Sequence, residues 1–202
     1  MQRLAITFII ALVLLAGCAT GNTGAGWVTL IDGTSGLDNF NRIGDANWRA
    51  ENGAIVADQG KGGFLVSKAS YRDYVLYAEF YAVDTTNSGI FIRAMDPAKI
   101  TAENSYEVNI FDQRPGPEFA TGAIVNFAKV PVPIIYRAGG KWNTFEITAK
   151  GAQVTVKFNG VTTVELNDGE FPAGPIALQY ATGAKGIVGG EIRWRKVQVR
   201  PL

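Results

Sequence analysis

The sequence predicts an all-β fold, built as a sandwich of two antiparallel sheets. From Trp27 onward helical periodicity is almost absent, and short runs of β-branched and aromatic residues alternate with Gly, Asn, Asp and Pro. Of the 202 residues, 47% are hydrophobic and 18% are charged, which is the balance of a globular domain. Neither an internal repeat nor a second composition regime interrupts the chain, so we expect one core.

Nine segments show the strand pattern most clearly. They are rich in β-branched and aromatic residues, and turn-forming residues separate most of them. In chain order they are residues 73–83, 88–95, 105–112, 122–128, 143–150, 152–158, 161–166, 175–181 and 191–199. Asn159-Gly160, between two of these segments, supplies the positive φ angles of a type I′ turn and therefore predicts a tight hairpin.

The last of these segments predicts a β-bulge. Ile192 and Trp194 share one parity, whereas Val197 and Val199 share the other. Because side chains alternate along a strand, one extra residue near Arg195 is needed to return the apolar side to the core.

The first residues predict an export signal that ends at a lipid anchor. Arg3 precedes an apolar run, residues 4–15, that is too short to span a bilayer comfortably. "LAGC" then ends at Cys18 and matches the lipobox of bacterial lipoproteins, in which the Cys is acylated and becomes the first residue. The alternative is a cleaved signal that happens to end near a Cys. We expect a signal peptide over 1–17, a flexible Gly-rich tether with lipidated Cys18 over 18–26, and the folded domain over 27–202.

The number of cysteines and the net charge limit the expected cellular location and the expected binding partners. Cys18 is the only cysteine, so the mature chain has no internal disulfide, and lipid attachment accounts for a lone exported thiol. Ala19 stands where an Asp would resemble the inner-membrane retention signal, which favours the outer membrane. Loss of Arg3 with the signal peptide leaves equal numbers of basic and acidic side chains. The sequence therefore gives no indication of the basic surface that nucleic-acid binding requires.

The chain contains no histidine, and this absence excludes several chemistries. Ser-His-Asp and Cys-His nucleophile systems, His-ligated zinc and imidazole bases are all ruled out. Chemistry, if present, depends on Asp, Glu, Tyr, Lys or Arg, with or without a hard divalent cation held by oxygen atoms.

Strand parity gathers polar side chains on one face of the segment "YEVNIFD", residues 106–112. Glu107 and Asn109 point to one side, and Tyr106, Val108 and Ile110 point to the other. The ordinary interpretation is the solvated face of a one-sided sheet. The functional interpretation is a binding or catalytic face.

Two further stretches supply polar candidates. In "GIFIRA" the parity puts Arg93 on the face opposite to the isoleucines, so Arg93 is expected beside Glu107 if the two strands are neighbours. Such a pair could equally be a cross-strand ion pair worth a few tenths of a kcal/mol. In "TTNSG", Asn87 and Ser88 either form a plain turn or offer hydrogen bonds to sugar hydroxyls at a sheet edge.

A series of motifs resembles one protein family over about residues 27–202. The series reads "GWVTLIDGTSGLDNF", "NWRAENGAIVA", "GGFLVSKASYRDYVLYAEF", "NSGIFIRA", "YEVNIFD" and "RWRKVQVRPL". In this order the motifs resemble the 3-keto-disaccharide hydrolase domain. The resemblance implies a concanavalin A-like jelly-roll sandwich and activity as a 3-keto-glucoside 1,2-lyase or 3-keto-2-hydroxyglucal hydratase, helped in some members by a divalent metal ion.

The resemblance also implies roles for the polar candidates. By matching positions, Glu107 is the expected base or metal ligand, Arg93 the stabiliser of an enolate or hydroxyl, and Asp112 a second acid or ligand. The expected substrate contacts are Asn109, Asn87, Ser88 and Gln179.

One departure from the family keeps a second function open. The family commonly reads Leu-Gln-x-His-Gly near its end, whereas residues 178–183 read Leu-Gln-Tyr-Ala-Thr-Gly. We therefore expect either an envelope enzyme that cleaves 3-keto-glycosides or a non-catalytic glycan-binding lipoprotein with the same fold. A purely structural envelope role is a third possibility, because fold alone does not determine function.

Overall fold

The computed structural model describes residues 26–183 and 189–202. The expected signal peptide, the lipidated Cys18 and nearly all of the tether lie outside the described residues. Within the described part, no helix is both long and apolar enough to cross a bilayer.

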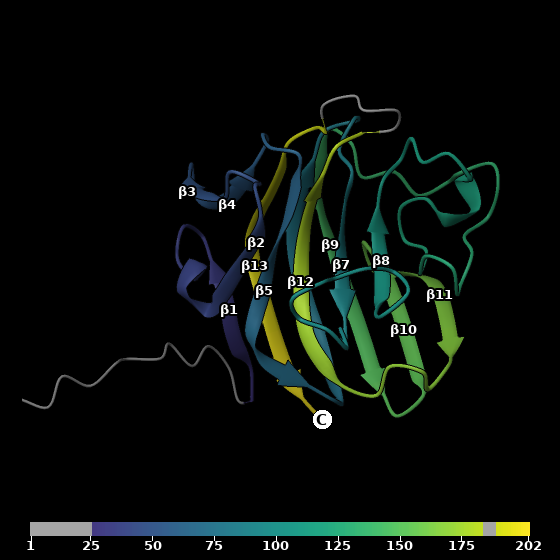
Figure 1. Cartoon of the computed structure of the whole chain (residues 1–202). Coiled ribbons are helices and arrows are strands. Elements are labelled where there is room, and N and C mark those ends of the chain that lie inside the picture. Colours follow the sequence, from purple (N-terminus) through teal and green to yellow (C-terminus); the bar gives the residue numbers. More distant parts are fainter. Residues whose placement is uncertain (1–25, 184–188) are drawn as a thin grey trace, which may run out of the picture.

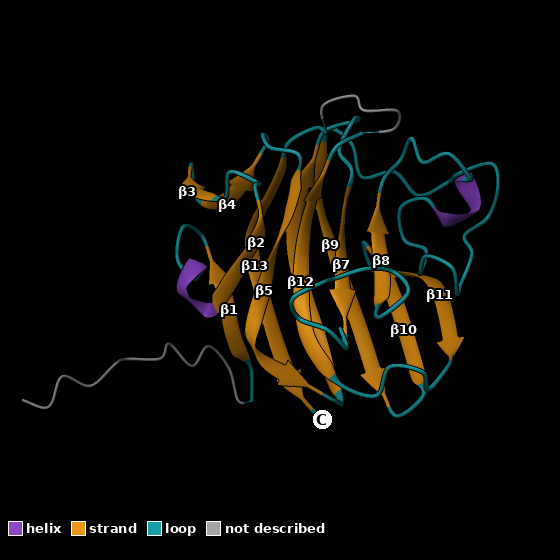
Figure 2. Cartoon of the chain, viewed as in Figure 1, coloured by secondary structure: helices purple, strands orange, loops and turns teal. Residues whose placement is uncertain are grey.

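Two antiparallel sheets face each other, as Figures 1 and 2 show, and the only helices of the described residues are two single 3-10 turns. The larger sheet runs in the order β11 (Val161–Asn167), β10 (Gln153–Phe158), β9 (Lys141–Lys150), β6 (Tyr74–Ala82), β13 (Ile192–Pro201), β4 (Ala54–Ala57) and β3 (Arg49–Glu51), with β1 (Val28–Asp32) also paired to β13. The smaller sheet runs β2 (Phe40–Gly44), β5 (Gly62–Tyr71), β12 (Gly174–Ala181), β7 (Ser88–Ile92) and β8 (Tyr106–Ile110). The short helices are η1 (Leu37–Asn39) and η2 (Pro117–Phe119).

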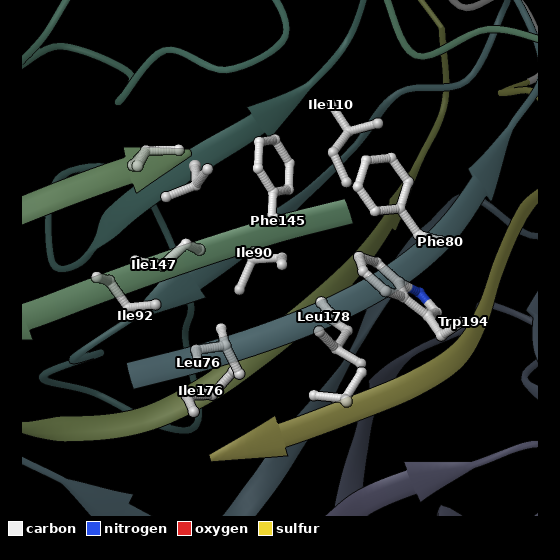
Figure 3. Packing of buried hydrophobic residues seen from close by; sticks show 14 of the residues in the cluster. Leu76, Phe80, Ile90, Ile92, Ile110, Phe145, Ile147, Ile176, Leu178 and Trp194 are labelled. Carbon is white, nitrogen blue, oxygen red and sulfur yellow. The ribbon is translucent and has the colours of Figure 1, made fainter. Parts of the chain in front are cut away.

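The core fills the space between the sheets (Figure 3). Alternate side chains of each strand supply it, which is what the period of two in the sequence predicts. The larger sheet contributes Leu76, Phe80, Phe145, Ile147 and Trp194, and the smaller sheet contributes Ile90, Ile92, Ile110, Ile176 and Leu178. Because the inner face of the smaller sheet is occupied in this way, the only face of this sheet left for a ligand is the outer one.

The two local predictions for the last strands are confirmed. Asn159 and Gly160 have φ angles of 49° and 82°, and β10 pairs with β11 directly across this turn. The register between β13 and β6 shifts between Trp194 and Lys196, and Ile192 and Val197 on either side of the shift are fully buried.

One predicted strand was wrong. Residues 122–128 do not form a strand, because positive φ angles at Gly122 and Asn126 break the extended backbone. The segment instead runs along the outer edge of β8, where the amide of Asn109 donates to the carbonyl of Ala123 and the amide of Val125 donates to the carbonyl of Glu107. The edge strand of the smaller sheet is thereby covered.

Candidate functional site

The outer face of the smaller sheet carries two parallel rows of side chains. Strand pairing fixes these rows, since residues opposite each other in neighbouring strands lie on the same face. From β2 to β8, one row is Ile43, Phe64, Gln179, Gly89 and Asn109, and the next is Asn41, Val66, Ala177, Phe91 and Glu107. Glu107 and Asn109 therefore share the outer face, as the parity predicted, and β7 and β8 are neighbours, which the parity had left open.

Glu107 is a nearly buried carboxyl group, with only 7% of its surface exposed. Burial raises the pKa of Glu107 to about 7, because the charged form loses water that the site does not replace. The positive charge of Arg114 acts in the opposite direction, and the negative charge of Glu103 adds to the rise. A carboxyl group with a pKa near neutrality has the property required of a general base.

Gly89 makes room for this carboxyl group. A Cβ atom at position 89 would lie 3.4 Å from Cγ of Glu107 and 3.4 Å from the ring of Phe91. The side chain of Glu107 thus leans along β7 over a position without a side chain of its own. A glycine inside a strand often marks such a close approach, and this signal in "NSGIF" could have flagged position 89 from the sequence.

Two amide oxygens on the same face have no hydrogen-bond partner among the described residues. They are Oδ1 of Asn109 and Oε1 of Gln179, and both are buried. The orientation of Asn109 is fixed because its Nδ2 donates to the carbonyl of Phe119. Buried acceptors without partners are rare in folded proteins, and hydroxyl donors of a ligand would satisfy them.

Glu107 and Asn109 are held rigidly by their backbones. β7 pairs with β8 on one side, with Phe91 opposite Glu107 and Gly89 opposite Asn109. The segment 122–125 bonds the other side of β8. A site on a strand bonded along both edges keeps its geometry better than a site on a loop.

Arg93 does not lie beside Glu107, and this prediction was wrong. The backbone of Arg93 has φ 55°, so β7 ends at Ile92 and the alternation stops before Arg93. The buried guanidinium donates to the carbonyls of Arg72, Gly151 and Phe171 and to the carboxylate of Asp73. Its five donors are used in these bonds, so Arg93 links three loops instead of facing a ligand.

Asp112 and Ser88 are also committed inside the protein. The carboxylate of Asp112 accepts hydrogen bonds from the hydroxyl of Thr121 and from the amides of Ala138 and Gly139, which pins the long connection from β8 to β9. Ser88 is fully buried and donates to the carbonyl of Gln179. Neither side chain joins the outer-face site.

Asn87 and Gln179 lie closer to that site. Asn87 donates from Nδ2 to the carbonyl of Thr182 and so fastens the end of β12 to the start of β7. Gln179 stands in the row between Phe64 and Gly89, and its free acceptor makes it a better candidate for ligand contact than Asn87.

The segment between β7 and β8 covers the lower part of the outer face in the view of Figure 1. Ile100 in this segment is buried against an apolar cluster with Val66, Phe91 and Ala177. On the uncovered side, a pocket of about 460 Å³ opens between β2, β5 and β12 and reaches Gln179. The site is therefore bounded by the covering segment on one side and the pocket on the other.

The donor set does not fit the divalent metal that the resemblance implies. Among residues 26–183 and 189–202, no three Cys, Asp or Glu side chains come together as metal ligands. On the outer face Glu107 is the one carboxyl group of the two rows, and its raised pKa favours the proton. Protein sites for Ca²⁺ usually gather several carboxylates, and the two rows supply only one.

The two-sheet antiparallel sandwich is a jelly-roll, and one outer sheet face carries a buried carboxyl group and two amide oxygens without partners among the described residues. The chain belongs to the family described as the 3-keto-alpha-glucoside-1,2-lyase-like domain, whose model matches residues 26–200. The suspected family is thereby confirmed, and with it a carbohydrate-related function. No curated protein matches the chain.

Solved structures confirm the jelly-roll fold. A candidate glycosyl hydrolase from Parabacteroides distasonis ATCC 8503 has a TM-score of 0.70 at 22% identity, over 87% of this chain and 99% of that chain. The carbohydrate-binding module CBM66 from Bacillus subtilis has a TM-score of 0.57 at 16% identity, over 86% of this chain and 94% of that chain. A Bacillus subtilis protein with a galectin-like fold has a TM-score of 0.59 at 12% identity, over 84% and 92%. At these identities the likeness establishes the fold alone.

Proposed function

We propose that the protein cleaves 3-keto-glycosides by elimination across C1–C2 followed by hydration, and that Glu107 is the base. One observation carries this proposal: a single nearly buried carboxyl group, with a pKa of about 7, shares the outer sheet face with two buried amide oxygens that have no partner among the described residues. The family to which the chain belongs supports the choice of substrate.

The reaction needs only one carboxyl group. A ketone at C3 acidifies the proton on C2, so a carboxylate can remove that proton and leave an enolate. The enolate expels the C1 oxygen with its bonding electrons, a C1–C2 double bond forms, and the departing oxygen takes up a proton. Water then adds its hydroxyl at C1 and a proton at C2, which gives net hydrolysis. No oxocarbenium ion arises, so the paired carboxylates of ordinary glycosidases are unnecessary.

The environment of Glu107 suits both the elimination step and the hydration step. With a pKa of about 7, the group is ionised often enough at neutral pH to accept the C2 proton. Its protonated form can afterwards return a proton to the departing oxygen or to C2. The burial that raises the pKa also keeps bulk water away from the enolate.

Other groups of the site bind the sugar ring and stabilise the negative charge of the enolate. Oδ1 of Asn109 and Oε1 of Gln179 accept hydrogen bonds from ring hydroxyls in this proposal. Because Arg93 is engaged elsewhere, the cation assigned to the O3 enolate is Arg114, whose charge already acts on Glu107. Strand alternation could not point to Arg114 from the sequence, because Arg114 lies in a loop.

The proposal is tested with purified protein and a 3-keto-disaccharide. The wild-type protein is expected to release 3-ketoglucose, and Glu107→Gln is expected to lower the rate at least about 100-fold, the contribution typical of a general base. Glu103→Gln is the matched control, since it removes a nearby exposed carboxylate. Equal loss in both variants would contradict the role of Glu107.

A second candidate function is glycan binding without catalysis. The two free amide acceptors favour it, and a carbohydrate-binding module shares the fold. Binding of glycans that survives Glu107→Gln, in a wild-type protein without turnover, would establish this function in place of the first.

The expected location is part of the proposal. We propose that the mature chain is anchored to the bacterial envelope through acylated Cys18, at the outer membrane, and that the domain acts in the aqueous compartment beside it. Several acyl chains at about 0.8 kcal/mol per buried CH₂ would hold it there almost permanently. Cys18→Ser should abolish labelling by radioactive palmitate and release the protein from the membrane fraction; a membrane-bound, labelled variant would refute the anchor.

A further inference from the structure

A pocket beside the proposed catalytic group remains without an assigned role. It lies between β2, β5 and β12, has a volume of about 460 Å³ and is lined by Ile43, Phe64 and Gln179 among others. This volume lies in the range of small-molecule sites. We call it the β2–β12 pocket.

The β2–β12 pocket lies on the same outer sheet face as Glu107 and shares Gln179 with the row that leads through Gly89 to Asn109. Neighbouring strands lie about 4.8 Å apart, so the pocket begins only one strand away from Gly89, over which Glu107 leans. A ligand with its sugar ring above Gly89 would place its substituent in the pocket.

The walls of the pocket are largely apolar. Ile43 and Phe64 face it from adjacent strands, opposite each other in the register. Phe64 is fixed because its ring packs edge-on against Phe91 with centroids 5.2 Å apart, and Phe91 stands opposite Glu107. Apolar packing thus runs from the pocket wall at Phe64 through the buried Phe91 to the position opposite Glu107.

Of the residues that line the pocket, Asp45, Lys61 and Gln179 bring polar side chains, which are fewer groups than the hydroxyls of a second sugar ring require. One carboxylate oxygen of Asp45, Oδ1, already accepts hydrogen bonds from the amides of Lys61 and Gly62, at 2.6 and 3.1 Å. Gly44, Gly62 and Gly63 line the same side and bring no side chains. A sugar ring carries several hydroxyl groups, and each one buried without a partner weakens binding.

We propose that the β2–β12 pocket binds the leaving group and selects a flat, aromatic aglycone over a second sugar ring. The aromatic ring would lie against Ile43 and the edge of Phe64, where apolar contact needs no hydrogen bonds. Which end of the substrate enters the pocket rests on the proposed function; the preference for an apolar group does not.

The test compares 3-keto benzyl glucoside with 3-keto methyl glucoside, each as both anomers. Both leaving groups depart as alkoxides, so their difference lies in the pocket and not in bond strength. The wild-type protein should favour the benzyl compound in kcat/KM by at least about tenfold, as expected for several added apolar carbons in a fitted pocket. Ile43→Ala and Phe64→Leu should bring the two rates to within about threefold of each other. Trp142→Ala, an exposed aromatic on the other sheet, should leave the ratio unchanged.

A parallel binding measurement separates this inference from the proposed function. Binding of unoxidised benzyl and methyl glucosides is followed by calorimetry or ligand-observed NMR in the same variants. If no 3-keto-glycoside is turned over, the proposed function falls, and a benzyl preference that Ile43→Ala removes still supports the pocket. Three results would overturn the assignment of the pocket to an aromatic aglycone. They are equal binding of both compounds, a preference for a 3-keto-disaccharide, and a benzyl preference that survives both pocket variants.

Discussion

At the scale of single residues, the proposed base Glu107 carries a cost in stability. Its pKa is raised to about 7 by burial, whereas an unfolded chain would leave it at the usual value of 4.5. The folded state therefore holds the proton more tightly than the unfolded state between these two pH values. The free energy of unfolding falls as pH rises through this window and levels off above pH 7.

Removing the charge should relieve this cost. Glu107→Gln is expected to be about 3 kcal/mol more stable than the wild type at pH 8, because one pKa unit corresponds to about 1.4 kcal/mol. Near pH 4 the two proteins should differ little. Urea unfolding at both pH values measures the difference. If the stability that Glu107→Gln gains over the wild type were smaller at pH 8 than at pH 4, the result would contradict a buried carboxyl group at position 107.

The same group should control the pH dependence of the reaction. kcat/KM should rise with pH through a single ionisation near 7, because only the carboxylate accepts the C2 proton. Arg114→Gln should move this ionisation to higher pH, since the positive charge lowers the pKa of Glu107. Glu103→Gln should move it to lower pH, since the negative charge raises that pKa. Shifts in the reverse directions, measured by pH–rate profiles, would show that another group titrates.

At the scale of elements, the β7–β8 pair shows where strand parity predicts side-chain positions correctly and where it no longer applies. Inside β8, alternation correctly separates Glu107 and Asn109 from the core residues between them. Parity applies only while the backbone is extended, and Arg93 follows the last residue of β7 with a φ of 55°. The sequence offers no clear sign of this turn, because Arg rarely adopts positive φ.

Arg93 should therefore behave as a structural residue. Arg93→Met leaves Asp73 and three loop carbonyls without their donor, and should lower the free energy of unfolding by roughly 3 kcal/mol or more. At a temperature where the variant is still folded, the ionisation near pH 7 in its kcat/KM profile should stay in place. An unchanged stability with a displaced ionisation would instead put Arg93 in the reaction.

At the scale of the whole molecule, the sandwich was predictable and the surroundings of the site were not. Period-two patterning, the Asn159-Gly160 turn and the bulge near Arg195 are local properties that the sequence states directly. The burial of Glu107, the room above Gly89 and the pocket beside Gln179 arise from strands and loops distant in sequence. Only the register of five strands and the covering segment with Ile100 bring them together.

The central claim is that this face uses Glu107 to remove the C2 proton of a 3-keto-glycoside. The most direct measurement follows a 3-keto-glycoside in heavy water by NMR, with wild-type protein, Glu107→Gln and Glu103→Gln side by side. Deuterium at C2 and release of 3-ketoglucose are expected with wild type and Glu103→Gln, and neither with Glu107→Gln. Exchange and release that persist in Glu107→Gln, or that are absent from the wild-type protein, would contradict the claim.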